Sequence, residues 1–322
     1  MKISTIARLT SAFLLTLSGS FFAAPAQVIS DKPIQYVIAF PPGGESDVVA
    51  RLQADLSFRL YQQQMIVLNK AGAGGGLAWS QMNNYPNDGT SIVGINLPHI
   101  VLQPLQEGSQ FKTEDISGVY YYHFTPDALM VSANSPYKTY QDFIDAAKKN
   151  PGKLTLAGSG QYSGNQMAAE RLNRLAGIKI EYVPFKGTGD LISSLIGMHV
   201  DGTMGYLPLA IQQKEKVRTL AIATEKRHPA LPDVPTFKEL GYPAVVGETW
   251  MSIFAPAGTP KSIVDKLSKS INQITNSAEY KDAMLKLGDD AKTTTPEELL
   301  DVTKKESAMW KALIEQLGIK GE

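Results

Sequence analysis

The chain contains no cysteine among its 322 residues. That absence excludes disulfide bonds, iron–sulfur ligation, a thiol nucleophile and a lipid anchor on a cysteine. Histidine is also scarce, and no pair of histidines has the spacing of a metal-binding motif: His99, His123, His199 and His228. Because transition metals in proteins are held mainly by histidines, cysteines and clustered acids, we expect no metal. We also expect no cofactor and no catalytic residue.

Charge of one sign is not in excess. The chain has 31 basic and 31 acidic residues. Proteins that bind nucleic acids usually carry a basic surplus, so we expect no nucleic-acid partner. Long apolar runs are missing too: Leu9 to Phe22 is broken by serine, threonine and glycine. Because that run is shorter than the roughly 20 apolar residues of a membrane-spanning helix, we expect no direct membrane insertion.

The first 26 residues have the three-part layout of a secretory signal peptide. Lys2 and Arg8 precede the apolar run, and the small residues Ala24–Ala26 follow it. We predict cleavage after Ala26 and a periplasmic location; the alternative is an uncleaved anchor helix. Cleavage leaves about 300 residues, more than one hydrophobic core usually serves, so we expect two domains.

Two segments of the chain share one pattern. In the first, the β-rich run Ile34–Phe40 enters the turn Pro41–Gly44, and apolar residues then recur every four positions from Val48 to Leu60. In the second, Lys153–Ala157 leads into Gly158–Gly160, and a helical stretch follows. Each segment therefore predicts a strand, a glycine loop and a helix.

Short apolar strands and helical stretches alternate through the rest of the chain. Examples are the strand-like Leu129–Ser132 and Thr219–Ala223 and the helical Tyr140–Lys149. This alternation favours parallel sheets flanked by helices, the α/β class. Near the end, Thr295–Glu298 has the form of a capping box and predicts the start of a last helix.

A glycine turn that opens onto a helix is suited to binding an anion. The first N–H groups of the helix have no partner within it, and the helix dipole adds positive potential. Two such loops on two lobes can hold one carboxylate or phosphate from both sides. The alternative is that each glycine turn only reverses the chain, which is the commoner case for a single loop.

Two glycine-rich patterns can be compared with cofactor-binding motifs, and neither matches one. Gly158, Gly160 and Gly164 have the wrong spacing for a dinucleotide-binding motif, and Gly72–Gly76 has no clear helical pattern after it.

At larger scale the sequence resembles the Bug-type receptors, the extracytoplasmic solute-binding proteins of tripartite tricarboxylate transporters. The resemblance covers the chain from about Ile34 to the C-terminus, and seven blocks in order carry it: FPPGGESDVVARL, GAGGG, PNDGTSIVG, PGKLTLAGSGQYSG, YVPFKGTGDLISSLIG, RTLAIATEKRHPALPDVPTFKELGYP and FAPAGTPKSIV.

The resemblance implies a two-lobed type II periplasmic-binding-protein fold with the ligand in a cleft between the lobes. It also implies that carboxylates are held by backbone amides and ordered waters of the two glycine loops. Carried over by position, the binding residues are Phe40, Pro41, Gly43, Gly44, Ser46, Asp47, Gly158, Ser159, Gly160 and Ser163.

At four positions the residue, or the sequence around it, differs from what is frequent in the family. Gln166 stands where many members have histidine, and Gly205 where many have aspartate; we include both in the predicted site. His99 matches a frequent histidine near the cleft and is included as well. Glu45 replaces a frequent proline, and an acid there repels an anionic ligand unless it faces solvent.

The block order predicts lobes that are interleaved in sequence. We expect residues 27–125 and 246–322 to form one lobe and residues 126–245 the other. The expected function is that of a monomeric periplasmic receptor that delivers a small organic acid to transporter subunits, which it contacts transiently. One alternative is a receptor for a signalling system. Another is an extracytoplasmic hydrolase, which we disfavour because Ser163 is not in a nucleophile elbow.

Overall fold

A computed structural model describes residues 30–105, 109–113, 116–245, 248–291 and 294–317. The predicted signal peptide, residues 1–26, lies outside the described residues. Within them, no helix combines the length and apolar character needed to cross a bilayer.

The fold is α/β, with a ten-stranded sheet whose main path runs β2-β1-β3-β9-β4-β7-β5-β6, while β8 and β10 pair with β4. The strands are β1 (Ile34–Ile38), β2 (Met65–Asn69), β3 (Ser91–Leu97), β4 (Ile116–Ser132), β5 (Thr155–Gly158), β6 (Glu181–Pro184), β7 (Gly202–Tyr206), β8 (Val217–Ile222), β9 (Glu248–Pro256) and β10 (Asp290–Ala291).

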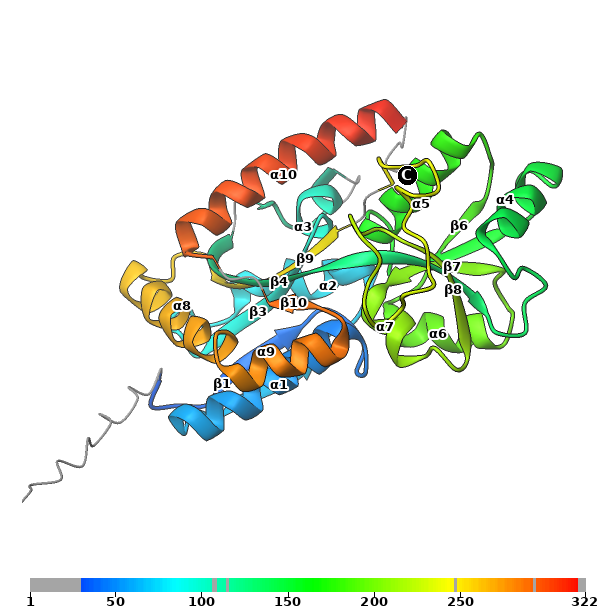
Figure 1. The fold of residues 1–322 in the computed structure, drawn as a ribbon. Helices are drawn as coiled ribbons and strands as arrows, with labels where there is room; N and C mark the ends of the chain where they lie inside the picture. The colour runs from blue at the N-terminus through cyan, green and yellow to red at the C-terminus, as the bar shows by residue number, and fades with distance from the viewer. Residues whose placement is uncertain (1–29, 106–108, 114–115, 246–247, 292–293, 318–322) are drawn as a thin grey trace, which may run out of the picture.

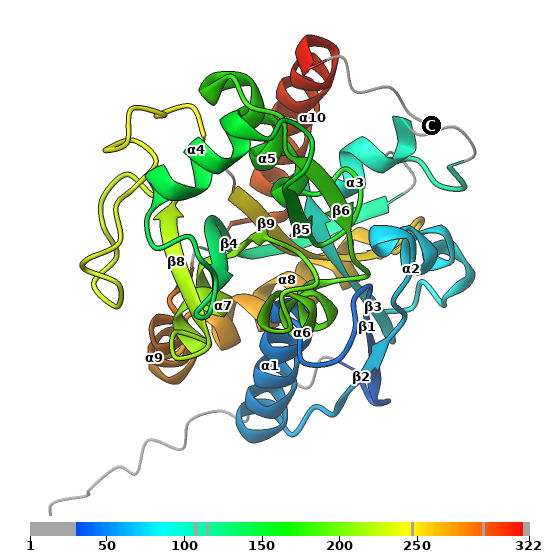
Figure 2. The same cartoon turned by 90° about the vertical axis from the view of Figure 1, so that its right-hand side faces the viewer.

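Helices pack around both halves of this sheet (Figures 1 and 2). They are α1 (Glu45–Tyr61), α2 (Gly76–Ser80), α3 (His99–Leu102), α4 (Tyr140–Lys149), α5 (Gly164–Ala176), α6 (Thr188–Ile196), α7 (Leu207–Gln212), α8 (Lys261–Thr275), α9 (Ala278–Leu287) and α10 (Pro296–Leu317), with short 3-10 turns at Ala73–Gly75, Met82–Asn84 and Gln103–Leu105.

Each half contains a parallel unit of the predicted kind. In the first half β1 pairs in parallel with β2 and β3, and in the second half β5 pairs in parallel with β6 and β7. The strand–loop–helix units β1–α1 and β5–α5 are confirmed, as is the capping box, in which Thr295 and Glu298 bond to each other's backbone N–H. Parallel strands need helical crossovers, so this local pattern is sufficient to specify both units.

The long strand β4 joins the two halves. From Ile116 to Pro126 it pairs with β9, and from Asp127 onward it pairs with β7 and β8. Figure 1 shows it running from the half that holds β3 and α1 to the half that holds β7 and α6. The change of partner falls near residue 125, where the predicted boundary lies, and the division of the chain into two lobes stays a prediction.

Two local differences from the sequence reading have simple causes. The predicted strand Leu129–Ser132 is only the end of the 17-residue β4, because its first part contains polar and aromatic residues that mask the apolar pattern. Gly72–Gly76 does lead into a helix, α2, whose 5 residues are too few to show helical periodicity.

The C-terminal helix α10 touches both halves. It packs on β4 and α3 of the first half. At the second half, the Arg171 guanidinium of α5 lies 4.9 Å from the centre of the Trp310 ring, and Arg174 Nη1 donates to the Gln316 carbonyl over 3.1 Å.

Candidate functional site

The N-termini of α1 and α6 meet at the boundary between the halves, beside Ser159 of the second glycine loop. A Cβ added to Gly44, the N-cap of α1, would lie 3.2 Å from Thr188 Oγ1, at the start of α6. Figure 2 shows these two helices next to each other. Because the first turn of a helix leaves N–H groups unpaired, two sets of donors, one from each half, face this region.

Cavities lie along this boundary. An inner one of about 10 Å³ is lined by Phe40, Glu45, Ser46, Asn96, Ser159, Thr188, Tyr206 and Met251. An outer one of about 170 Å³ shares Glu45, Thr188 and Tyr206 with it and also includes Gly43. One water molecule needs a cavity volume of about 10–15 Å³. The inner cavity therefore suits a single water, and the outer cavity suits a small molecule.

The first glycine loop is held in place by Asp47. Its carboxylate accepts the Gly43 N–H over 2.9 Å, both oxygens receive donors from Arg51, and Asn69 Nδ2 donates over 2.9 Å. Partial burial alone raises the pKa of Asp47, but these donors hold it below its usual value. Asp47 therefore shapes the loop, whereas the predicted residues Phe40 and Ser46 line the inner cavity.

The second glycine loop is fixed by its own side chains. Ser159 donates from both N–H and Oγ to Asn165 Oδ1, over 3.0 and 2.6 Å. Ser163 caps α5 by accepting the Gln166 N–H over 3.1 Å, and the Gln166 side chain in turn accepts the Tyr162 N–H over 2.6 Å. Ser159 reaches the inner cavity, while Ser163 and Gln166 organise the loop behind it.

Two glycines of this loop have no room for a side chain. A Cβ on Gly158 would overlap the ring of Tyr182, and a Cβ on Gly160 would lie 2.8 Å from the Gly74 Cα of the first half. Gly160 also has φ +116°, which residues with side chains rarely adopt. Gly160 lines a third cavity of about 270 Å³ that also includes Gly74.

A chain of hydroxyl contacts links the two halves. Thr249 Oγ1 of β9 donates to the Tyr206 hydroxyl over 3.2 Å, and that hydroxyl lies 3.0 Å from Ser159 Oγ. Burial raises the pKa of Tyr206 far above its usual value, so the hydroxyl keeps its proton. Asn165 extends the chain by donating to Asp127 over 2.5 Å.

Three other predicted residues do not line the inner or outer cavity. His99 is fully buried, and its ring packs edge-on against Phe40 and Trp79; burial lowers its pKa to about 3, so it is neutral and supports Phe40 from behind. Gly205 pairs with Ala128 within the sheet. Pro41 contacts α6, because a Cβ on Gly187 would lie 2.7 Å from Pro41 Cδ.

The sequence reading missed Thr188, Tyr206, Asn96 and Met251. Thr188 follows the glycine turn of the FKGTGD segment, the same signal as at the other two loops, and that signal could have found it. Asn96 and Met251 lie on neighbouring strands β3 and β9, and no local pattern marks them. Glu45 was singled out, and it lines both the inner and the outer cavity.

Comparison with known proteins now assigns the fold to a family. The family model described as "Tripartite tricarboxylate transporter family receptor" matches residues 48–319. The chain belongs to this receptor family. A curated relative, the UPF0065 protein in the tcbD-tcbE intergenic region of Pseudomonas sp. (strain P51), is 31% identical over 94% of this chain and 91% of the relative. Protein BugT of Bordetella pertussis is 28% identical, over 97% and 98%.

Solved structures of similar receptors have the same periplasmic-binding-protein fold. The periplasmic binding protein BugD superposes with a TM-score of 0.86 at 27% identity, over 91% of this chain and 100% of BugD. An R. palustris protein with adipate gives 0.84 at 26%, over 89% and 98%. MatC from Rhodopseudomonas palustris with bound malate gives 0.81 at 27%, over 88% and 98%. This family consists of solute receptors and not of enzymes.

Proposed function

We propose that this receptor binds a small organic acid with at least one carboxylate between its two halves and delivers it to a tripartite tricarboxylate-type membrane transporter. The observation that carries the proposal is that the N-termini of α1 and α6 meet at the inner and outer cavities, with Ser159 of the second glycine loop lining the inner one. Those two cavities have no lysine or arginine among their described lining residues. Helix N-termini attract anions without such side chains.

The solved relatives support the same ligand class. Two of them were solved with adipate and with malate, both small dicarboxylates. In the present chain, Ser46 at the start of α1 and Ser159 and Thr188 of the second half would hold a carboxylate from opposite sides, with a water in the inner cavity. We propose that the halves, residues 27–125 with 246–322 and residues 126–245, close as lobes around it.

The remaining proposals concern where and how the receptor works. The homologous structures include periplasmic binding proteins, and a cleaved signal peptide would place this chain in the same compartment. We propose that it acts there as a monomer without a nucleic-acid partner. Delivery requires only transient contact with the transporter subunits.

Native mass spectrometry of protein taken from its own periplasm tests the ligand class. The expected result is one organic acid per chain, and a retained sugar or peptide would overturn the proposal. Titration calorimetry with adipate and malate then measures affinity. The matched control is 1,6-hexanediol, which has the chain length of adipate without its carboxylates and is expected not to bind.

The transport role needs a separate experiment. Cross-linking to native membranes with ligand present should recover integral transporter subunits. Recovery of a membrane-bound sensor kinase in their place would assign the receptor to signalling.

A further inference from the structure

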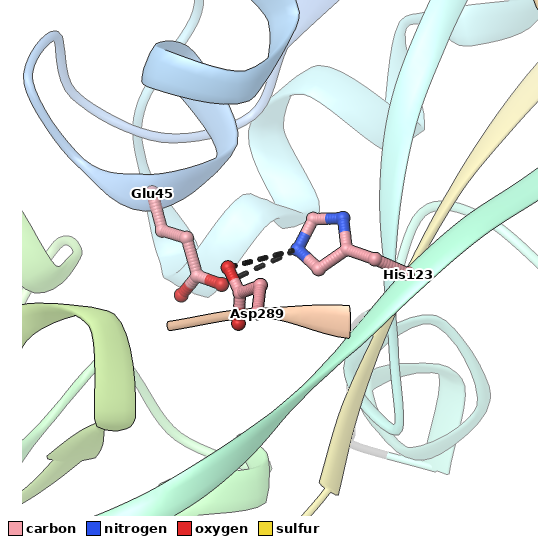
Figure 3. Close-up of side chains that lie close together, drawn as sticks. All are labelled: Glu45, His123 and Asp289. Atoms are coloured by element: carbon pink, nitrogen blue, oxygen red, sulfur yellow. Dashed lines mark hydrogen bonds and ion pairs between the residues drawn. The ribbon is translucent and has the colours of Figure 1, made fainter. Parts of the chain in front are cut away.

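Three ionisable side chains from distant parts of the sequence meet under the start of α1 (Figure 3). Glu45 is the first residue of α1, His123 lies on β4, and Asp289 immediately precedes β10. Figure 3 shows both carboxylates directed at the same ring nitrogen of His123. His123 and Asp289 play no part in the carboxylate-binding scheme proposed above, and only Glu45 lines its cavities.

The spacing of the three groups fits a metal ion. His123 Nε2 lies 3.3 Å from Glu45 Oε1 and 3.8 Å from Asp289 Oδ2. One ligand atom from each residue can be chosen so that all lie within 4.8 Å of one another. Zinc binds nitrogen and carboxylate oxygen at about 2.0–2.2 Å, so neighbouring ligand atoms in a tetrahedron are separated by about 3.3–3.6 Å.

The cluster is buried and its hydrogen-bonding capacity is only partly used: the carboxyls of Glu45 and Asp289 each interact with Thr125 and with one another. The side chains of His123 and Asp289 are fully buried, and that of Glu45 is 8% exposed. By distance and angle, neither oxygen of Asp289 nor Glu45 Oε2 makes a well-formed hydrogen bond to a described residue. Their ion-pair contacts in the described part of the chain are with His123 alone. Buried polar atoms without partners cost free energy, so the site favours a ligand that satisfies them.

Burial also sets the protonation of the cluster, with which a cation would have to compete. Burial raises the pKa of Glu45 to about 8, and burial together with the Glu45 carboxyl raises the pKa of Asp289. Burial lowers the pKa of His123, so the imidazole is neutral and able to act as a ligand. Tyr122 and Tyr206, the nearby phenols, remain protonated. A divalent cation would have to displace the acidic protons, so its affinity for the cluster should rise with pH.

We infer that Glu45, His123 and Asp289 form a binding site for a divalent first-row transition-metal cation, with Zn²⁺ as the best match. One imidazole and two carboxylates suit such a cation better than Mg²⁺ or Ca²⁺, which prefer six or more oxygen ligands. The sequence reading predicted no metal because the three ligands come from three separate segments, and motif spacing detects only ligands close together in sequence.

The site borders the proposed solute cleft, since Glu45 lines both the inner and the outer cavity. A bound cation would therefore cancel the charge of an ionised Glu45 next to the ligand. This consequence rests on the proposed function, whereas the metal site itself does not.

Zinc titration of EDTA-treated, full-length mature protein tests the site, by calorimetry and native mass spectrometry. One Zn²⁺ per chain is expected, and Ca²⁺ is expected not to compete. Glu45→Gln and Asp289→Asn keep side-chain size and remove one anionic ligand each, so each should weaken zinc binding by about 10-fold or more. Melting curves of the metal-free variants establish whether they fold. If Asp289→Asn does not fold, the zinc affinity of Glu45→Gln alone tests the site.

The matched control is His199→Gln, which removes an exposed histidine outside the cluster. Zinc affinity should be unchanged in this variant. The proposal fails if wild-type protein binds no zinc, if Glu45→Gln binds as the wild type does, or if His199→Gln is the variant that loses binding.

A second titration separates this site from the proposed function. Malate or adipate affinity is measured at pH 8.5 with and without one equivalent of Zn²⁺, and zinc should strengthen binding in the wild type but not in Glu45→Gln. If neither acid binds under any condition, the proposed function is in error, and the zinc titration still tests the metal site.

Discussion

Gly160 and Gly74 lie against each other across the boundary between the halves, so closely that a Cβ on Gly160 would be 2.8 Å from the Gly74 Cα. The contact joins the second glycine loop to the glycine run before α2. A side chain at Gly160 would therefore force the two loops apart and would hinder the closure proposed above.

Gly160→Ala should therefore weaken organic-acid binding. Loss of one charge-assisted hydrogen bond costs roughly 1.5–3 kcal/mol, or about 10- to 150-fold in affinity, measured by calorimetry. Gly177→Ala is the control, because Gly177 also has a positive φ, +61°, but its Cβ would meet nothing within 4 Å. Both variants carry backbone strain. Equal affinities in the two would show that the contact with Gly74 has no role in binding.

Tyr206→Phe should reduce both stability and affinity. It removes the hydroxyl that accepts from Thr249 and contacts Ser159 beside the inner cavity. Tyr61→Phe is the control, since it deletes a hydroxyl bonded to Gln273 over 2.8 Å within the first half. Each variant should lose about 1 kcal/mol of unfolding free energy in urea. Only Tyr206→Phe should also lose affinity, by about 10-fold, and an affinity loss in both would point to general destabilisation.

The unfolding free energy of metal-free protein should fall as the pH rises from 6.5 to 8. An unfolded glutamate releases its proton near its ordinary pKa of 4.5, while burial keeps Glu45 protonated to about 8. Between these values the native state binds more protons, so raising the pH favours unfolding, by at most about 1.4 kcal/mol per pH unit for one group. Asp289 acts in the same direction.

The choice of pH window reduces the opposite contribution of His123, which fades as the pH rises above 6.5. Its lowered pKa destabilises the native state below the ordinary value of 6.5, so urea unfolding is compared at pH 6.5 and above. Glu45→Gln should flatten the dependence, whereas Glu181→Gln on an exposed position of β6 should leave it unchanged. A wild-type slope that persists in Glu45→Gln would rule out Glu45 as its source.

Replacing Arg171 and Arg174 together with alanine should favour the open arrangement of the halves. These side chains connect α5 to α10 through the Trp310 ring and the Gln316 carbonyl. Loss of a cation–π contact costs roughly 0.5–1 kcal/mol. The variant should therefore bind the organic acid about 2- to 5-fold more weakly than the wild type. Small-angle scattering of the ligand-free variant should show a larger radius of gyration. Arg59→Ala, whose ion pairs with Asp55 and Glu279 stay within the first half, should show no expansion.

The sequence by itself determined the units whose causes are local. A β-rich run, a glycine turn and four-residue apolar spacing were enough to predict β1–α1 and β5–α5, because strand, turn and helix preferences depend on neighbouring residues. The same holds for the capping box of Thr295 and Glu298. The resemblance to the receptor family likewise rested on ordered local blocks.

Only the tertiary structure decided which distant residues meet. Thr188 faces Gly44 because α6 and α1 pack across the boundary, and Glu45 joins His123 and Asp289 because α1, β4 and β10 converge. Such contacts depend on how helices and strands pack, which no spacing along the chain encodes. Local signals therefore located the glycine loops, while packing alone placed Glu45 against the buried histidine and aspartate rather than in solvent.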